Sequence, residues 1–354
     1  MMGHVDTTAA APPLSGPEGG VLSRSRIVAK PGFNRWMVPP AALAIHLCIG
    51  MAYGFSVFWL PLTNVLGITH PIACPAGYGV LDMLTTTACD WRLSDVNIMY
   101  TLFFVFLGSA AAVGGTRMEV AGPRWAGILS ALCWCGGLVI SAGGVYLHQL
   151  WMLWLGSGVI GGIGLGLGYI SPVSTLIKWF PDRRGMATGM AIMGFGGGAL
   201  IGAPLADILM TTFRTPESVG VWQCFLVLAG IYAVFMLAGA FSYRFPPAGW
   251  KPEGWTPPAT TGRLVTSHNV SPADAQNTPQ FWLIWAVLCL NVSAGIGLLG
   301  LASPMLQEMF GGSLIGQSGT SYTALDGTQR QAVASIAAGF VGLLSLFNIA
   351  GRFF

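Results

Sequence analysis

The sequence predicts an all-α membrane protein, and three observations support this. Seven long windows contain no Asp, Glu, Lys or Arg: residues 36–69, 96–116, 125–177, 185–206, 218–243, 275–307 and 331–351. Hydrophobic residues make up 53% of the 354 positions and charged residues only 8%, against about a quarter in soluble domains. The basic residues between the windows also gather on one side of the predicted membrane.

These windows are long enough to cross a bilayer as helices. An α-helix rises about 1.5 Å per residue, so about 20 apolar residues cross a hydrocarbon core of roughly 30 Å. A helix also satisfies its own backbone hydrogen bonds, which lipid cannot do. Because the third window has room for two helices, we expect eight spans, at 37–60, 95–115, 125–146, 151–175, 185–210, 221–242, 281–305 and 331–354.

The charges between the spans predict the orientation. If the N-terminus is cytoplasmic, the Lys and Arg residues on the outer side are Arg92, Arg214 and Arg330, and twelve others lie inside. Cytoplasmic loops of membrane proteins carry such an excess, so we expect a cytoplasmic N-terminus. The remaining basic residue, Arg352, lies within the eighth apolar span. The net charge of +3 is therefore no signal for nucleic acid.

The spans divide the chain into four parts. Residues 1–35 are polar and are expected to form a disordered cytoplasmic tail, followed by a six-helix N-terminal half at 36–243. A Pro-rich cytoplasmic linker at 244–280 leads to 281–354, the first two helices of a C-terminal half that we expect to be incomplete. Transporters built from two six-helix repeats have this layout.

Glycines recur at helical spacing in the fourth and fifth spans. The rows are Gly158, Gly162 and Gly166 in the fourth span and Gly194, Gly198 and Gly202 in the fifth. Helices in lipid associate through close backbone approach at small residues. The spacing fits a static interface as well as one that slides. The run 194–199 also matches a dinucleotide-binding fingerprint, but no strand precedes it, so nucleotide binding is not expected.

Two of the seven cysteines, Cys74 and Cys89, fall in the predicted external loop. An oxidising compartment would allow a disulfide there, and two free thiols are the alternative. The other five lie within spans, where thiols pack as small apolar groups. No metal site is expected.

The loop between the second and third spans resembles a cytoplasmic signature of the major facilitator superfamily. It runs from Gly115 through Glu119 to Arg124. A carboxylate near basic residues could latch the cytoplasmic side in one conformation, whereas the alternative role is simple orientation by charge. The candidate gate residues are Gly115, Glu119, Arg124, Arg183 and Arg184.

The run 166–199, with Lys178-Trp-Phe-Pro-Asp-Arg-Arg184 at its centre, is similar to the oxalate/formate antiporter family of that superfamily. Residues 53–58, 278–282 and 346–352 extend the resemblance. It implies a bundle of about twelve helices, eight of them present here, that exchanges small carboxylates across the bacterial inner membrane by alternating access. No cofactor is implied, and we expect a monomer whose partners are the lipid bilayer and a small organic anion.

The resemblance also implies an anion site near the bilayer midplane, with Arg352 at the position of the family's arginine on the eighth helix. The residue chemistry points the same way. An Arg at membrane depth costs at least about 2.5–3.5 kcal/mol, so it normally faces a cavity or a partner. Its planar fork of donors suits a carboxylate. The alternative is that Arg352 snorkels to the headgroups from the end of its span.

Three further residues are candidates for the same site. Tyr53 and Tyr169 match aromatic positions of the family's site, although either side chain could belong to the core. His46 lies in the middle of the first span, where it could contact the anion or bind a proton. A lone His on a span can equally be structural.

Together these features predict a secondary transporter of mono- or dicarboxylates such as oxalate, formate, lactate or pyruvate. A proton-coupled monocarboxylate symporter, or a truncated inactive or sensor-like remnant, is the alternative. An enzyme is not expected, since no cluster of catalytic carboxylates, His or Cys is visible in the sequence.

Overall fold

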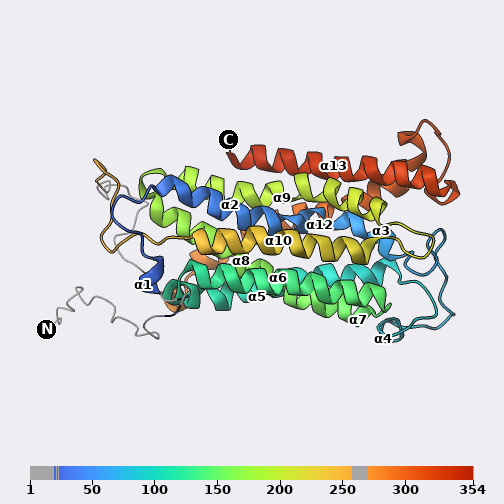
Figure 1. Cartoon of the computed structure of the whole chain (residues 1–354), viewed down its shortest axis with the longest axis horizontal. Coiled ribbons are helices and arrows are strands. Elements are labelled where there is room, and N and C mark those ends of the chain that lie inside the picture. Colours follow the sequence, from blue (N-terminus) through green and yellow to red (C-terminus); the bar gives the residue numbers. More distant parts are fainter. Residues whose placement is uncertain (1–19, 21, 23, 257–269, 354) are drawn as a thin grey trace.

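The computed structural model describes residues 20, 22, 24–256 and 270–353. Within them, eight helical segments are long and apolar enough to cross a membrane. They are Arg35–Leu62, Leu93–Ala121, Pro123–Tyr146, Leu150–Trp179, Pro181–Thr212, Val221–Ser242, Pro279–Leu314 and Gly327–Arg352. The helices lie side by side along the long axis of the molecule (Figure 1). The prediction of an all-α bundle with eight spans is confirmed.

The two ends of the bundle differ in chemistry, and we name them accordingly. The basic end carries α1 (Arg24–Ile27) and the segment after α10 (Val221–Ser242), at the left of Figure 1. The disulfide end carries the loop around α4 (Val80–Met83), at the right of the same view. Most of the predicted tail (1–19) and part of the predicted linker (257–269) lie outside the described residues.

Several helices extend beyond their apolar windows. The second span, α5, runs from Leu93 to Ala121, and the seventh, α12, from Pro279 to Leu314. The spans that we expected here, 95–115 and 281–305, are shorter than these helices. Backbone hydrogen bonding continues past the point where side chains stop being apolar, so hydropathy underestimates these lengths. The third span, α6, is Pro123–Tyr146, and the eighth, α13, is Gly327–Phe353.

Two spans are not regular α-helices throughout. The first consists of η1 (Arg35–Met37), α2 (Val38–Ile49), a 3₁₀ segment η2 (Gly50–Phe58) and α3 (Trp59–Leu62). The fourth consists of α7 (Leu150–Leu153), a π-helical segment η3 (Trp154–Gly161) and α8 (Gly162–Trp179). Irregular turns of this kind often occur at functional sites or hinges. Apolar composition alone does not reveal them.

The glycine rows of the fourth span place it between two neighbours. A Cβ on Gly158 or Gly162 would press on the backbone oxygens of Met99 and Phe103, and one on Gly166 on that of Leu107, all in α5. On another face, Gly164 and Gly168 contact α6 in the same way, at Trp134 and Ser130. Close approach at both surfaces explains why glycine recurs at these positions of the span.

The fifth span, α9 (Arg184–Thr212), packs closely against two other spans through its glycines. A side chain on Gly194 would meet Leu43 and His46 of α2, and one on Gly198 would overlap the backbone of Gly50. On the face toward α13, Gly196 lies against Asn348 and Arg352. The helix α9 therefore connects the first span with the eighth, although these spans are far apart in sequence.

Part of the predicted disordered tail is ordered against the start of the linker. The Ala29 N–H donates to the Phe245 carbonyl at 2.9 Å, and the Phe245 N–H donates to Ile27. The indole of Trp179, at the end of α8, donates to the Arg244 carbonyl at 2.7 Å and packs against Trp250. Polar composition predicts disorder for residues 1–35, but the Trp179 side chain at the end of α8 gives the tail and the linker an aromatic surface to pack on.

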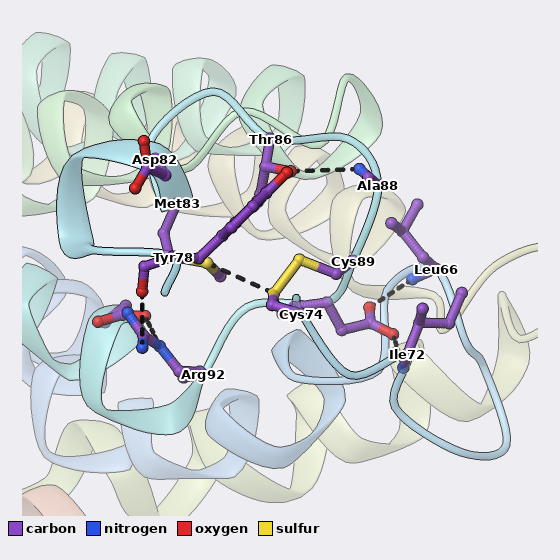
Figure 2. The surroundings of a disulfide bond; sticks show 12 residues. Leu66, Ile72, Cys74, Tyr78, Asp82, Met83, Thr86, Ala88, Cys89 and Arg92 are labelled. Atoms are coloured by element: carbon purple, nitrogen blue, oxygen red, sulfur yellow. Dashed lines mark hydrogen bonds and ion pairs between the residues drawn. A yellow bond between two sulfur atoms is a disulfide. The ribbon is translucent and has the colours of Figure 1, made fainter. Parts of the chain in front are cut away.

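A disulfide closes the loop at the disulfide end, between Cys74 and Cys89 (Figure 2). The adjacent carboxylate of Asp90 accepts three backbone hydrogen bonds, from Leu66 and Ile72 at 2.7 and 2.8 Å and from Gly67 at 2.9 Å. Charge-assisted bonds of this kind fix loop geometry more firmly than neutral ones. The loop is therefore anchored to the end of the first span.

His148, between α6 and α7, completes this anchor. Its ring stacks on Trp91 with centroids 4.4 Å apart, and its Nε2 lies 2.9 Å from the Cys89 carbonyl. Its Nδ1 is buried without a hydrogen-bond partner. Burial lowers the pKa of the His148 imidazole, against the opposing effects of the Cys89 carbonyl and the Asp90 charge. The neutral ring is thus the folded form.

The close contact of Gly198 with Gly50 predicts intolerance to a single methyl group. Gly198→Ala is expected to destabilise the protein by about 1–3 kcal/mol, because the methyl would overlap backbone atoms that have no room to move. Gly230→Ala is the matched control, since Gly230 of α10 has no neighbour within 4 Å. Unfolding of the purified protein by denaturant would measure both. Equal loss of stability in the two variants would contradict this account.

The buried His148 predicts weakening in acid. Its folded pKa is lowered from the usual value of about 6.5, so below that pH the unfolded chain binds more protons than the folded one. The free energy of unfolding should therefore decrease as the pH falls below about 6.5. His148→Gln should reduce this pH dependence, whereas replacement of the exposed His70 should not. Unfolding midpoints at pH 5 and 7.5 would test it.

Candidate functional site

A cavity of ≈ 1060 Å³ opens among the helices that come together around α9 and α12. Tyr53 of η2, Tyr169 of α8 and Arg352 of α13 line it, so three of the four predicted substrate-binding residues face one space. Phe195 of α9 lines it as well. These residues come from four different spans and meet only in the folded chain.

Arg352 lies deep in the bundle rather than at its end. Its Nη1 donates to the Ile192 carbonyl at 2.8 Å, and its Nη2 donates to the Tyr53 hydroxyl at 3.2 Å. Ile192 is eight residues into α9 from Arg184, roughly 12 Å along the helix axis. The ion pairs of the described residues do not include Arg352, whose two hydrogen-bond partners named above are neutral oxygens.

Gly196 makes this position of Arg352 possible. A Cβ there would lie 2.5 Å from Asn348 Oδ1 and 3.4 Å from Arg352 Nη1. Asn348 Oδ1 is itself buried without a hydrogen-bond partner. Hence α13 sits close against the backbone of α9 and turns its guanidinium toward the cavity, next to the Tyr53 ring at 5.8 Å.

The fourth predicted residue, His46, lies behind the cavity wall. Its side chain is fully buried, and its ring packs against those of Tyr169 and Phe195 with centroids 5.6 and 6.1 Å away. Phe195 also packs edge-on against Tyr53 and Tyr169, at 4.8 and 5.2 Å. The three rings Tyr53, Tyr169 and Phe195 therefore separate His46 from the cavity. Direct contact of His46 with an anion there would require these rings to move.

Sequence reasoning missed the opposite wall of the cavity. It is formed by Asn97, Tyr100 and Thr101 of α5 and by Trp285 and Ser293 of α12. These polar and aromatic residues in apolar spans were a usable signal, but they occur singly. Only the packing of α12 against α3 and α5 brings them together: the Gly300 carbonyl of α12 accepts from the Trp59 indole of α3 at 2.6 Å, and Gly300 lies against the Tyr100 ring of α5.

Family comparison fits this geometry. The sequence matches the Major Facilitator Superfamily over residues 78–354. The chain belongs to this superfamily. The match covers the second to eighth spans, which include α12 and α13, whereas the first span, which carries Tyr53, precedes it.

Individual relatives in the superfamily are distant. The chain is 25% identical to an oxalate:formate antiporter of Oxalobacter formigenes over 278 residues, covering 76% of this chain and 54% of the relative. It is 24% identical to an uncharacterized MFS-type transporter, YhjX, of Escherichia coli strain K12, covering 71% and 58%. It is 29% identical to human monocarboxylate transporter 11, covering 55% and 35%. The chain spans about half the length of the first two.

At the disulfide end, the eighth span of this superfamily member is tied to the fifth. The Gln331 amide donates to the Thr211 hydroxyl at 2.6 Å, and the Ser335 hydroxyl donates to Asp207 at 2.7 Å. Arg330 also donates to the Thr69 carbonyl, at 3.0 Å. With the contacts of Arg352 further along, α13 is held to the N-terminal half at both ends.

The predicted gate residues at the basic end are arranged differently from the expectation. Glu119 accepts from Lys178 at 2.5 Å, within the N-terminal half, because α5 and α8 end side by side. Arg124 is buried and donates to the Phe241 carbonyl at 3.2 Å. Arg183 approaches Asp182 at 3.9 Å. Gly115 is partly buried and Arg184 is exposed. A latch between halves stays a prediction for these five.

In the loop between the fourth and fifth spans, the carboxylate of Asp182 forms a two-bond ion pair. It accepts from both terminal nitrogens of Arg35, at 2.7 and 3.0 Å, and both side chains are mostly buried. Bidentate pairs are the strongest of their kind. This pair joins the ordered tail segment to the loop between the fourth and fifth spans.

Asp182→Asn should therefore loosen the tail segment. Loss of the pair is expected to cost about 1 kcal/mol, which corresponds to about fivefold more frequent opening of the segment. Trypsin cleavage after Arg26, next to the buried Ile27, should accelerate by that factor. Glu119→Gln is the control, because its pair with Lys178 is largely exposed and contributes little. Equal cleavage rates in both variants would refute the assignment.

Proposed function

We propose that this protein is a secondary transporter of small organic anions, with Arg352 as the group that binds the carboxylate. The carrying observation is a guanidinium that lines a large cavity within the spans and has only neutral oxygens as described hydrogen-bond partners. The proposal makes it a transporter rather than an enzyme.

The cost of the charge supports this role. An uncompensated Arg in an apolar bundle is expensive, and an Arg that served structure alone would be expected to have a fixed acid nearby. The hydrogen bonds to Ile192 and Tyr53 use two of the five N–H donors of Arg352. The others are available for a carboxylate, which the planar fork can bind with two parallel bonds.

The rest of the cavity suits a small polar solute. Tyr53 and Tyr169 offer hydroxyl groups beside Arg352, and Asn97 and Ser293 offer amide and hydroxyl groups from the opposite wall. Aromatic rings shield the site from lipid and allow only a few polar contacts, as is usual for small-molecule sites. The relatives' names, which include oxalate:formate antiporter and monocarboxylate transporter, are consistent with mono- or dicarboxylates.

We infer that transport proceeds by alternating access, with exchange of one anion for another, as the name of the Oxalobacter relative suggests. The glycine contact of α9 with α13 is a narrow surface on which one half could rock against the other. We place the protein in the bacterial inner membrane with its basic end in the cytoplasm. This chain spans about half the length of these two relatives. We therefore propose the transport activity for the whole protein rather than for these residues alone.

The proposal predicts loss of transport when Arg352 changes. Uptake of labelled oxalate, formate, lactate or pyruvate into proteoliposomes should fall about 10- to 100-fold in Arg352→Gln, since a hydrogen bond to a charged group contributes about 1.5–3 kcal/mol. Arg352→Lys keeps the charge but loses the fork, so it should retain more. Arg214→Gln, at the disulfide end, is the control. Unchanged uptake in both Arg352 variants would show that Arg352 does not bind the anion.

A further inference from the structure

The surroundings of His46 are unusual for a buried neutral histidine. Its Nδ1 lies within hydrogen-bond reach of the Ala191 carbonyl of α9, and its Nε2 lies 3.1 Å from the Tyr169 carbonyl of α8. Both partners are backbone carbonyl oxygens, and such oxygens only accept hydrogen bonds.

A neutral imidazole cannot satisfy both of these oxygens. It carries one N–H, so its second nitrogen would turn a lone pair toward a carbonyl oxygen, and the two would repel. The imidazolium form carries two N–H groups and would donate to Ala191 and Tyr169 at the same time. The hydrogen-bond geometry around His46 is therefore complementary to the protonated ring.

Electric charge opposes that protonation. Among the described residues, the charged side chain whose field reaches His46 is Arg352 of α13, and two positive charges in an apolar bundle repel. From α8 the Tyr169 ring packs against the His46 ring, and a tyrosine is neutral near pH 7. The hydrophobic core cluster against which Tyr169 packs also contains Tyr53 of η2, Cys48 of α2, Cys135 of α6, and Cys224 and Tyr232 of α10, which are neutral in their usual state. From α9 the ring of Phe195 and the Ala191 carbonyl face His46.

We propose that His46 is a proton-binding site that is thermodynamically linked to the anion site at Arg352. This rests on the proposed function. When an anion neutralises Arg352, the field that opposes the imidazolium disappears. A proton from solvent then binds the free ring nitrogen, and both carbonyls gain a donor. The N–H bond that forms takes its proton from a hydronium ion, whose O–H bond breaks and leaves water.

The linkage works in both directions. If the anion favours protonation of His46, protonation must favour the anion by the same factor. The Tyr53, Tyr169 and Phe195 rings keep the two sites apart, so the coupling acts through the charge rather than through contact. Each anion that is exchanged then crosses the membrane together with a proton.

The test is proton uptake on anion binding by the purified protein. Oxalate and formate serve as probes in weakly buffered solution with a pH indicator, between pH 6 and 8, where carboxylates stay ionised. We expect up to one proton bound per anion, and a Kd that decreases by up to tenfold for each unit by which the pH falls. His46→Gln should still bind the anion, with no proton uptake and a Kd independent of pH.

A second variant covers the case in which His46→Gln does not fold. The chain has five histidines, and His4, His70, His148 and His268 can be replaced together by Gln, which leaves His46 alone. This variant should keep the proton uptake. Anion binding without proton uptake in the unmodified protein, uptake retained in His46→Gln, or uptake lost in the His46-only variant would each overturn the linkage. Failure of both anions to bind would instead overturn the proposed function, and the linkage with it.

Discussion

The close packing of α9 against the first and eighth spans is the contact on which the rest of the structure depends. Lipid supplies no hydrophobic force between helices, so only near approach of backbones gives enough van der Waals contact to hold them together. Gly198 allows α9 to meet Gly50, and Gly196 allows it to meet Asn348 and Arg352. The same face that joins the helices thus also places the functional side chains.

Charged side chains have different partners at the ends of the bundle and among the spans. Arg35 with Asp182 and Lys178 with Glu119 form ion pairs at the basic end, and Arg92 with Asp95 forms one at the disulfide end. The middle of the bundle holds Arg352, bonded to a carbonyl and a hydroxyl. The ion pairs organise loops and tails, whereas the charge among the spans lines a cavity. The proposed anion transport accounts for a charged side chain that lines a cavity among the spans.

Much of the fold could be predicted because its signals are local. Seven apolar windows, one of them long enough for two helices, correspond to eight helical segments, and the recurring glycines mark the faces of α8 and α9 that meet other helices. The limits of α5 and α12 were underestimated, since hydrogen bonding along a helix continues after the apolar residues end. The 3₁₀ segment η2 and the π-helical segment η3 could not be predicted, because their amino-acid composition is as apolar as that of the regular helices. The ordering of residues 24–35 depends on Trp179, a residue distant in sequence.

The candidate site divides in a similar way. Arg352 was selected because a charge in an apolar span is costly, His46 because it is a titratable group in a span, and Tyr53 and Tyr169 because they match aromatic positions of the family that the sequence resembles. These signals are properties of the sequence alone. The arrangement of the four residues is not. Three face one cavity and His46 lies behind a wall of rings, while Asn97 and Trp285 complete a surface that no local pattern marks. Hydropathy and charge determine which segments enter the membrane, because each residue's transfer from water is nearly independent. Tertiary structure decides which side chains meet, because that depends on how helices far apart in sequence cross.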